Sequence, residues 1–466
     1  MRFGKSLGVF CAGLLVFLGG CTNSMNTTPP NGMGNVFSLV TDAAPTLPGV
    51  VSFQVMITGV TVNNAGGSLS VLTNPATIDF ARFSGLHELL DLDTVPPGQY
   101  TSVTITGSSP IIGFLDTSGG SGVPPVLNTM NATPSTFSVT VPLTKTLVVD
   151  QTDMVGLLID LDLGQTIQTS GGFVTGTVNP TFDVRGLTAD DAQAEIDDFR
   201  GGVVSVDTSS NAFTMTGARG RNWNVTTDSQ TEFDDGATFA NLAANDIVEV
   251  SGKLDPVTRG IKADEVEVLS QDGFFAGGLT TFVSPASPAP ATQIQVYVRA
   301  ELPNLSTTAP IGQIDSFALN GSEKYYIADF RNPLTALLFS NTTLAPGQRV
   351  GIGGVITTSG GSSSLTVHRV VLGRQGQQGM WVVGSTQVQS GNAGSFQLND
   401  NFLAGVLLPQ PVTVITTNFT NFVNLAGLSA LTGSGPIHLR VVGFVLMDQQ
   451  TNQPVIMARR VEQLNP

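Results

Sequence analysis

Asp246-Ile-Val-Glu-Val-Ser-Gly252 is a short strand-like run that closes in glycine. Runs of the same kind return at residues 344–354 and 437–443, and each of the three is followed by an apolar run that ends in leucine. Self-similarity of this kind along a chain indicates repeated structural modules. The few short strands expected in each unit suit a small closed barrel. The sequence therefore predicts three β-barrel repeats, which extend over the following residues: 200–272, 273–375 and 376–466.

The first of these units carries a second pattern, G-x-V-x-x-V-D, as Gly201-Gly-Val-Val-Ser-Val-Asp207. Because it contains this pattern as well as the run at 246–252, the segment 201–269 resembles the domain of unknown function DUF5666. It departs from that family at Ala244-Asn245, where the family has glycine before the residue that corresponds to Asp246. The two later units diverge from the pattern. The units are similar in strand number to the oligonucleotide-binding (OB) barrel, and we expect OB-like barrels. This is an analogy of fold, and a fold assigns no function by itself.

The amino-terminal part of the chain alternates with a period of two. Residues 51–57 read Val-Ser-Phe-Gln-Val-Met-Ile, and the alternation returns at 137–141 and 157–163. Such alternation over short runs is typical of half-buried strands. Turn signals rich in Gly, Pro, Asn and Ser separate the runs. We therefore expect an antiparallel β-sandwich over residues 35–187.

Several motifs of this part occur in an order that resembles the domain of unknown function DUF4382 of bacterial lipoproteins. The motifs are Thr41-Asp-Ala-Ala-Pro45, the run at 53–60, Leu89-Leu-Asp-Leu92, Pro97-Gly-Gln-Tyr100 and Leu158-Ile-Asp-Leu-Asp162. The first of them has one more alanine than is usual in that family. The resemblance implies a β-sandwich in the cell envelope and supplies no catalytic residue.

One stretch is expected to be helical. Residues 188–199 read Thr-Ala-Asp-Asp-Ala-Gln-Ala-Glu-Ile-Asp-Asp-Phe. Thr188 can cap a helix N-terminus, and Asp191 stands three positions later, as in a capping box. Acidic residues in a first turn also interact favourably with the helix dipole. We expect one short acidic linker helix over 188–199, between the sandwich and the first barrel.

The first residues of the chain predict export and a membrane anchor. Arg2 and Lys5 precede a short apolar run that ends in Leu18-Gly-Gly-Cys21. This is the arrangement of a secretory signal peptide, and the run is too short for a transmembrane helix. The ending resembles the bacterial lipobox, which implies that residues 1–20 are removed and that Cys21 is lipidated. An ordinary signal peptide with a coincidental cysteine is the alternative.

Three further features bear on this anchor. Cys11 lies inside the apolar run and is a poorer acceptor for lipid. Thr22, rather than aspartate, follows Cys21, and by resemblance to the bacterial sorting rule this implies an outer membrane lipoprotein. Residues 21–34 are polar and rich in Pro and Gly, so we expect a flexible tether there.

The composition restricts the partners. The formal net charge is −15 and the pI is near 4.4, which argues against a nucleic-acid partner because such partners require a basic surface. Only 12% of residues are charged, and abundant Gly, Ser and Thr favour an all-β fold. No cysteine follows Cys21, so the mature chain forms no internal disulfide and core burial alone holds it together.

Two aspartates are the candidates for ion binding. Asp160 and Asp162 are two positions apart on an expected strand, hence on one outward face. Paired carboxylates could bind a cation weakly or act as acid and base, whereas a solvated strand face is the structural alternative. The histidines, His87, His368 and His438, have no second ligand at metal spacing, so we predict no metal site and no cofactor.

Aromatic side chains are the candidates for ligand stacking. Trp223, Trp381, Tyr297, Tyr325 and Tyr326 could each stack on a sugar ring. The chain has 26 phenylalanines against 2 tryptophans and 4 tyrosines, and this ratio favours core packing for these rings as well.

No motif indicates a reaction. The sequence shows no G-x-S-x-G at a strand–helix elbow and no P-loop. We therefore predict a lipid-anchored, non-catalytic envelope protein that binds or scaffolds an unidentified envelope protein or glycan. A glycan- or peptide-binding surface module of an uptake or adhesion system is a sharper alternative. A carboxylate-dependent envelope hydrolase is a third, and it requires two acids in one cleft.

Overall fold

A computed structural model describes most of the chain beyond residue 31. The described residues are 32–42, 47, 49–83, 86–116, 118–119, 122–151, 153–171, 173–191, 194–217, 220–233, 237–303, 311–327, 337–359, 362–399, 411–432 and 435–464. The predicted signal peptide, Cys21 and nearly all of the predicted tether lie outside these residues. The predicted all-β class is confirmed: the described residues form several sheets, and two of these close into five-stranded barrels.

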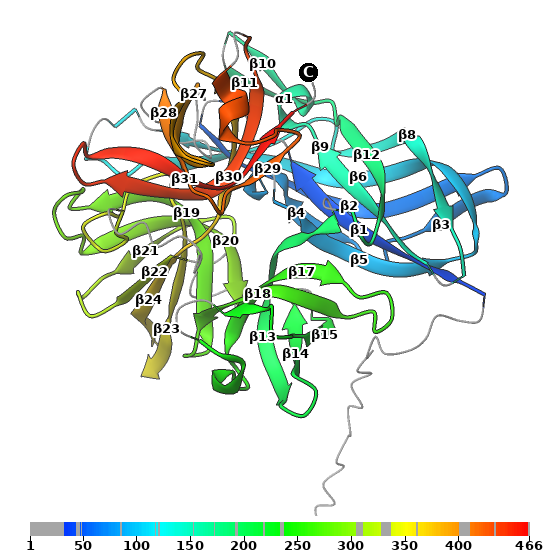
Figure 1. The fold of residues 1–466 in the computed structure, drawn as a ribbon, viewed down its shortest axis with the longest axis horizontal. Helices are drawn as coiled ribbons and strands as arrows, with labels where there is room; N and C mark the ends of the chain where they lie inside the picture. The colour runs from blue at the N-terminus through cyan, green and yellow to red at the C-terminus, as the bar shows by residue number, and fades with distance from the viewer. Residues whose placement is uncertain are drawn as a thin grey trace, which may run out of the picture.

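Residues 34–188 form the sandwich module (Figure 1). One sheet has the strand order β12-β9-β1-β5, and the other has the order β3-β2-β6-β7, with β4 added to β2 and β8 added to β6. The described pairs are antiparallel except β1 with β9, which is parallel. The elements are β1 (Gly34–Asp42), β2 (Val50–Asn64), β3 (Gly67–Ser70), β4 (Ala76–Asp79), η1 (Phe80–Arg82), β5 (Glu88–Val95), β6 (Gly98–Asp116), β7 (Val126–Asn131), β8 (Thr136–Val149), β9 (Met154–Leu161), α1 (Leu163–Thr166), β10 (Ile167–Ser170), β11 (Phe173–Val178) and β12 (Phe182–Thr188).

The alternation predicted for residues 51–57 places the core as expected, with one exception. Phe53, Val55 and Ile57 are buried in the core between the two sheets. Val51 was expected on the same side, but it lies in a separate apolar cluster with residues of the second barrel. A register shift between Val50 and Ser52 turns its side chain to the other face, as a β-bulge does.

Three further modules follow and repeat one strand order: barrel 1 (residues 196–270), barrel 2 (274–372) and barrel 3 (375–463). In each module the first strand pairs with the glycine-closing strand, and that strand pairs with the last one. A short strand runs parallel to the last strand in all three modules. In barrels 1 and 3 further strand pairs close the circle, whereas the described residues of barrel 2 form an open path.

The bounds of the elements in the three barrels are as follows. Barrel 1 has β13 (Ile196–Asp207), β14 (Ala212–Gly217), β15 (Asn222–Thr226), β16 (Glu232–Phe233), η3 (Phe239–Asn241), β17 (Ile247–Leu254) and β18 (Ile261–Ser270). Barrel 2 has β19 (Phe274–Ser284), β20 (Gln293–Leu302), β21 (Ile314–Ala318), β22 (Lys324–Ile327), β23 (Arg349–Ser359) and β24 (Ser362–Leu372). Barrel 3 has β25 (Gln375–Trp381), β26 (Gln387–Ser390), β27 (Ala393–Asn399), β28 (Val412–Thr416), β29 (Asn421–Val423), η4 (Leu428–Thr432), β30 (His438–Asp448) and β31 (Gln453–Gln463).

The recurring glycines have one structural role. Gly252, Gly354 and Gly443 each lie at a register shift against the last strand of their module. A Cβ atom at these positions would lie 2.2, 2.2 and 2.0 Å from a backbone oxygen of that strand. Only glycine permits so close an approach of two backbones. The glycine that closes each repeat in the sequence is therefore the residue that lets the barrel bend.

The predicted linker helix over residues 188–199 is misplaced. The described part of the chain has one α-helix, α1, and it lies at Leu163–Thr166. The predicted contact between Thr188 and Asp191 does form, with the Thr188 N–H donating to Asp191 Oδ2 at 3.3 Å, but it closes a turn. Ile196 and Phe199 already belong to β13, where they are buried and pair with β17. Tertiary burial of these side chains overrides the local helix signal.

Barrel 1 covers the outer face of the sheet β12-β9-β1-β5. Phe37 and Leu158 of that sheet share one apolar cluster with Phe199 and Trp223 of barrel 1. The parallel strands β1 and β9 are therefore buried on both faces, as parallel strands usually are. The sandwich and barrel 1 are thus joined by a continuous core.

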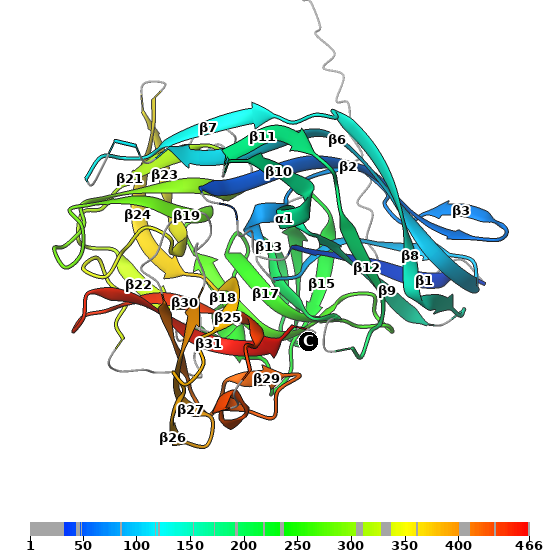
Figure 2. The ribbon, with the colours of Figure 1, turned by 90° about the horizontal axis from the view of Figure 1, so that it is seen from above.

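Barrel 2 contacts each of the other modules through apolar side chains. Val51 of the sandwich packs with Tyr297 of barrel 2, and Leu269 of barrel 1 packs with Phe275. Phe444 of barrel 3 extends the core of barrel 2. The four modules therefore surround a common centre, as Figures 1 and 2 show. In the described ranges, no helix has the length and hydropathy needed to cross a membrane.

Candidate functional site

Arg374 lies at the point where the three barrels meet, in the connection between β24 and β25. Its Nη1 is 3.2 Å from Glu265 Oε2 of barrel 1, and its Nη2 donates a hydrogen bond to Ser251 Oγ at 2.7 Å. Arg459 of barrel 3 approaches the same Glu265 oxygen at 3.9 Å. A connection of barrel 2, a strand of barrel 1 and a strand of barrel 3 are thus held by one carboxylate.

The surroundings of Arg374 are acidic. Burial lowers the pKa of Arg374, but four carboxylates outweigh this effect, and the net pKa is raised. These carboxylates are Glu265, Glu249, Asp197 and Glu195. The guanidinium therefore stays charged and serves as the central cation of the site.

A second carboxylate, Glu249, extends the network to barrel 2. Its Oε2 is 2.7 Å from Arg200 Nε and 3.8 Å from Arg349 Nη2. Arg349 in turn donates from Nη1 to the backbone oxygen of Arg374 at 2.7 Å. We call these residues the charged junction; its members are Arg200, Glu249, Glu265, Arg349, Arg374 and Arg459. Because each cation faces a carboxylate in a buried setting, removal of one member leaves a buried charge uncompensated.

His87 fastens the sandwich to the strand that enters barrel 1. The N–H of His87 donates to Asp197 Oδ2 at 3.0 Å, and the N–H of Asp197 donates to the oxygen of His87 at 3.0 Å. Its Nδ1 lies 3.2 Å from the backbone oxygen of Glu195. Burial lowers the pKa of His87 from 6.5 to about 4; Arg460 and Arg440 also lower this pKa, whereas Asp197 raises it.

This low pKa predicts a defined pH dependence of stability. The unfolded chain binds a proton at His87 below pH 6.5, but the folded protein does so only below about pH 4. The free energy of unfolding therefore falls as the pH drops from 6.5 to 4, and His87 contributes about 3 kcal/mol to this fall. Urea titrations at pH 7, 6, 5 and 4 should show a shallower fall for His87→Gln. A slope in His87→Gln equal to that of wild type would contradict the assignment.

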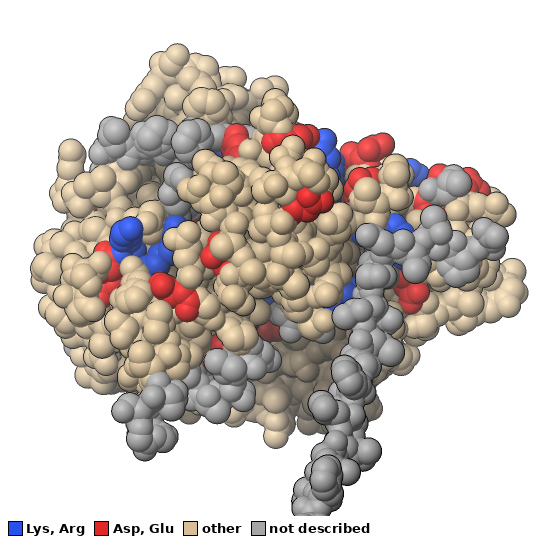
Figure 3. Space-filling view, turned by 90° about the horizontal axis from the view of Figure 1, so that it is seen from below, with Lys and Arg blue, Asp and Glu red and all other residues tan. Residues whose placement is uncertain are grey.

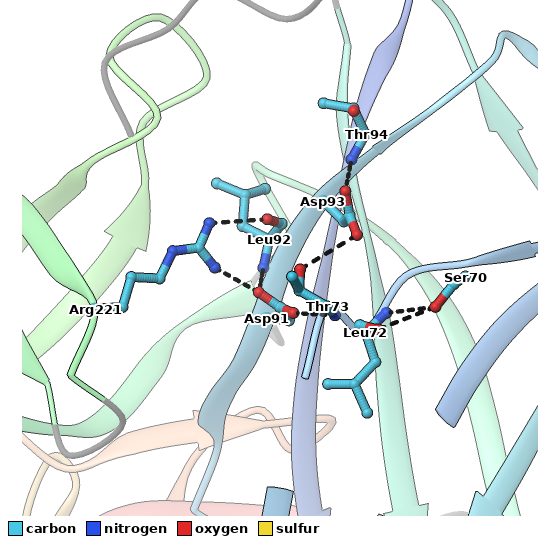
Figure 4. A network of polar contacts seen from close by, with 8 residues as sticks. All are labelled: Ser70, Leu72, Thr73, Asp91, Leu92, Asp93, Thr94 and Arg221. Atoms are coloured by element: carbon cyan, nitrogen blue, oxygen red, sulfur yellow. Dashed lines mark hydrogen bonds and ion pairs between the residues drawn. The ribbon is translucent and has the colours of Figure 1, made fainter. Parts of the chain in front are cut away.

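A second ion pair joins barrel 1 to the sandwich (Figure 4). Nη1 of Arg221 contacts Asp91 Oδ1, and its Nη2 donates to the backbone oxygen of Leu92 at 3.1 Å. Asp91 also accepts from the N–H groups of Thr73 and Leu92, at 2.7 and 2.8 Å. The guanidinium lies 4.8 Å from the ring centre of Trp223. Asp91 of β5 therefore links the β3–β4 connection of the sandwich to the β14–β15 connection of barrel 1.

Barrel 2 is bound to the sandwich by a buried tyrosine and a buried arginine. The hydroxyl of Tyr297 lies 3.5 Å from Asp79 Oδ2 and accepts from Gln54 Nε2 at 3.2 Å. Burial raises the pKa of Tyr297, so its hydroxyl stays protonated. Arg299 donates from Nη2 to the backbone oxygen of Val51 at 2.6 Å. Buried hydrogen bonds of this kind fix one orientation between two modules.

The two predicted aspartates, Asp160 and Asp162, lie at the end of β9. Asp162 follows the end of β9 and caps α1, with Oδ1 accepting from the N–H of Gln165 at 2.9 Å and Oδ2 from its Nε2 at 2.7 Å. Asp160 lies half-buried on β9, opposite Asp183 of β12. Burial raises the pKa of Asp42 on the neighbouring strand β1, and the nearby charges of Asp160 and Asp162 raise it further.

The predicted stacking tryptophans are buried. Trp223 is 4% exposed and packs edge-on against Phe199, and Trp381 is 2% exposed and donates from Nε1 to Thr386 Oγ1 at 3.0 Å. Tyr297 is buried as well. None of these three rings offers a face to a ligand, and the alternative of core packing holds for them.

The other two tyrosines are half-buried. Tyr325 packs edge-on against Phe339, with ring centres 5.7 Å apart. The guanidinium of Arg369 lies over the ring of Tyr326, 3.9 Å from its centre. Intramolecular partners thus occupy the rings that sequence reasoning offered for stacking.

The histidines and acids form no metal cluster in the part of the chain that the structure describes. His87 is buried where the sandwich meets β13, His368 lies 2.9 Å from Asp272, and His438 is exposed on β30. Charged side chains on the surface are sparse, and both signs occur close together on the face shown in Figure 3.

Sequence reasoning did not find the charged junction. Glu249 stands between two valines, Glu265 stands beside Asp264 in a strand with several charges, and Arg374 stands in a short connection. The only signal is a charge at a position where the alternation requires a buried residue. Such a position indicates a buried partner of opposite charge but not which module supplies it.

Comparison with known proteins finds two protein families that match parts of the chain. No curated protein matches the chain. One similar solved structure, described as drosophila Unr CSD456, has 11% sequence identity, covers 57% of this chain and 97% of that chain, and has a TM-score of 0.14, too low to support an argument about fold. The family models agree with the two predicted resemblances: residues 33–176 match the domain of unknown function DUF4382, and residues 200–267 match the domain of unknown function DUF5666.

Proposed function

We propose that this protein is a lipid-anchored, non-catalytic cell-envelope protein whose four β-modules form one rigid body for binding a partner. The observation that carries the proposal is the charged junction. Its carboxylates face arginines of neighbouring modules, as Glu265 faces Arg374 and Arg459. Acids neutralised in this way are poor general acids or bases, because catalysis requires a titrating group with access to substrate. They instead hold modules in a fixed arrangement.

The surroundings of Asp162 speak against the hydrolase alternative, since both of its carboxylate oxygens accept hydrogen bonds from Gln165 at the start of α1. The glycan alternative loses its candidate platforms, since both tryptophans are buried. Peptide binding does not depend on either set of residues. A rigid, sparsely charged body on a lipid tether supports the binding or scaffolding of an envelope partner, which we expect to be a protein.

Lipid anchoring is tested by phase partition of the full chain produced in a bacterial host. Wild type is expected in the detergent phase of a Triton X-114 extract, because an acyl chain adds about 0.8 kcal/mol of membrane affinity for each buried CH₂. Cys21→Ser is expected in the aqueous phase. Cys11→Ser, at the cysteine inside the apolar run, is the matched control and should partition like wild type. Detergent-phase recovery of Cys21→Ser would refute the anchor.

A further inference from the structure

β7 is an edge strand without the usual protection. In the described residues it pairs along its length with β6 alone, without a register shift. β11 approaches the far end of β7, through a bridge between Thr133 and Thr177 and through Gly176, which lies against the side chain of Met130. Residues 117–144 contain no charged side chain, and Val126 is 60% exposed. Soluble proteins usually protect an edge with charge, proline or a bulge. β7 has none of these and is therefore open to pairing with another strand.

A groove runs beside the beginning of β7, between the sandwich and barrel 2. Its volume is about 430 Å³, and it is lined by Pro124, Pro125, Val126, Leu127, Gln295, Gln313 and Ile314. Leu127 and Ile314 also border the apolar contact between the two modules, so the groove continues that interface outward. On its barrel 2 side the groove meets β21, which in the described residues pairs only with β20.

The chemistry of the groove selects the kind of ligand. Its lining is apolar or amide-bearing and has no charge, so a charged group would lose hydration without gaining a partner. Gln295 donates from Nε2 to Ser316 Oγ at 3.2 Å, while its Oε1 is buried with no hydrogen-bond partner in the described residues. An extended peptide can place alternate apolar side chains in such a groove and pair its backbone with a strand edge.

We propose that this groove binds an extended, uncharged peptide segment of a partner protein, which adds as a strand to the edge of β7. This rests on the proposed function of a binding body and names the kind of partner. Backbone hydrogen bonds to β7 supply affinity, and the apolar lining supplies preference for small aliphatic side chains at alternate positions.

The test uses the mature full-length chain and a synthetic probe. The probe is the peptide Ser-Val-Thr-Val-Ser-Val-Thr with an amino-terminal fluorescein and a carboxy-terminal amide, followed by fluorescence anisotropy. We expect saturable binding that Val126→Asp and Gln313→Glu weaken by about tenfold or more. Both positions are exposed, so the fold tolerates the changes. Val257→Asp, at an 88% exposed valine of barrel 1, is the matched control and should bind like wild type.

Two further measurements distinguish backbone pairing of the peptide from other modes of peptide binding and from glycan binding. The same peptide N-methylated at every residue lacks backbone donors and should not bind. Binding that is insensitive to N-methylation or to the groove variants, or the absence of saturable binding, would overturn the proposal. Displacement of the peptide by a hexamer of N-acetylglucosamine would replace it with a glycan site. Neither result alters the phase partition, so failure of the peptide site is distinct from failure of the proposed function.

Discussion

Replacement of Arg374 by methionine is expected to lower the free energy of unfolding by about 3–5 kcal/mol, because the change leaves a group of buried carboxylates without their central cation. Glu265 would lose its 3.2 Å contact with Arg374, while Arg459 lies farther from it, at 3.9 Å. The backbone contact with Arg349 would be disturbed as well. Methionine keeps an unbranched chain of similar length, so the loss is chiefly electrostatic. Urea unfolding followed by tryptophan fluorescence measures it, since Trp223 and Trp381 report on barrels 1 and 3.

Arg185→Met is the matched control for this prediction. Arg185 also pairs with an aspartate, Asp183, at 2.9 Å, but the two side chains are 43% and 52% exposed. An exposed pair contributes at most about 1 kcal/mol, so this variant should unfold nearly as wild type does. Equal effects of Arg374→Met and Arg185→Met would contradict the role assigned to the charged junction.

Phe37→Ala is expected to destabilise the protein by about 3–5 kcal/mol, as removal of a fully buried phenylalanine ring does. Phe37 is 1% exposed and lies in the core shared by the sandwich and barrel 1. Its ring covers Gly156 of the neighbouring strand so closely that a Cβ there would lie 2.2 Å from the ring. Gly156→Val alone should therefore also destabilise, by about 1–3 kcal/mol, through overpacking.

The two changes should compensate in part. In Phe37→Ala the valine at position 156 occupies space that the ring has left, so the double variant should be more stable than the sum of the single effects by about 0.5–3 kcal/mol. Differential scanning calorimetry of all four proteins closes this cycle. Simple additivity would mean that the ring and the glycine do not contact each other.

The elements that were predicted correctly have local causes. The glycine of each repeat, such as Gly252, is required by the contact of two adjacent strands, and period-two alternation follows from burial of one sheet face. The linker helix was misplaced because Ile196 and Phe199 gain more from the core of barrel 1 than from a helix. The charged junction depends on residues of different modules, and no local pattern in the sequence records which modules meet.

The candidate sites also divide into features with a local sequence signal and features that depend on contacts between modules. Trp223 was a candidate because tryptophan often binds sugars, but its burial depends on β1 and barrel 1 packing together. The groove beside β7 has a signal that can be read in the sequence, the absence of charge over residues 117–144. Its second wall comes from barrel 2, and only the structure places the two together.

Distances between spin labels test most directly whether the four modules form one rigid body. The mature chain with Cys21→Ser contains no cysteine, so labels can be placed in pairs. The positions are Phe173→Cys, Val257→Cys, Ile311→Cys and Phe419→Cys, which are exposed on the sandwich, barrel 1, barrel 2 and barrel 3 in that order. Double electron–electron resonance should give one narrow distance distribution for each pair, and Arg374→Met should broaden the distribution between Val257→Cys and Phe419→Cys. Broad or multiple distributions in the otherwise unchanged chain would contradict the account, because they would mean that the modules move independently.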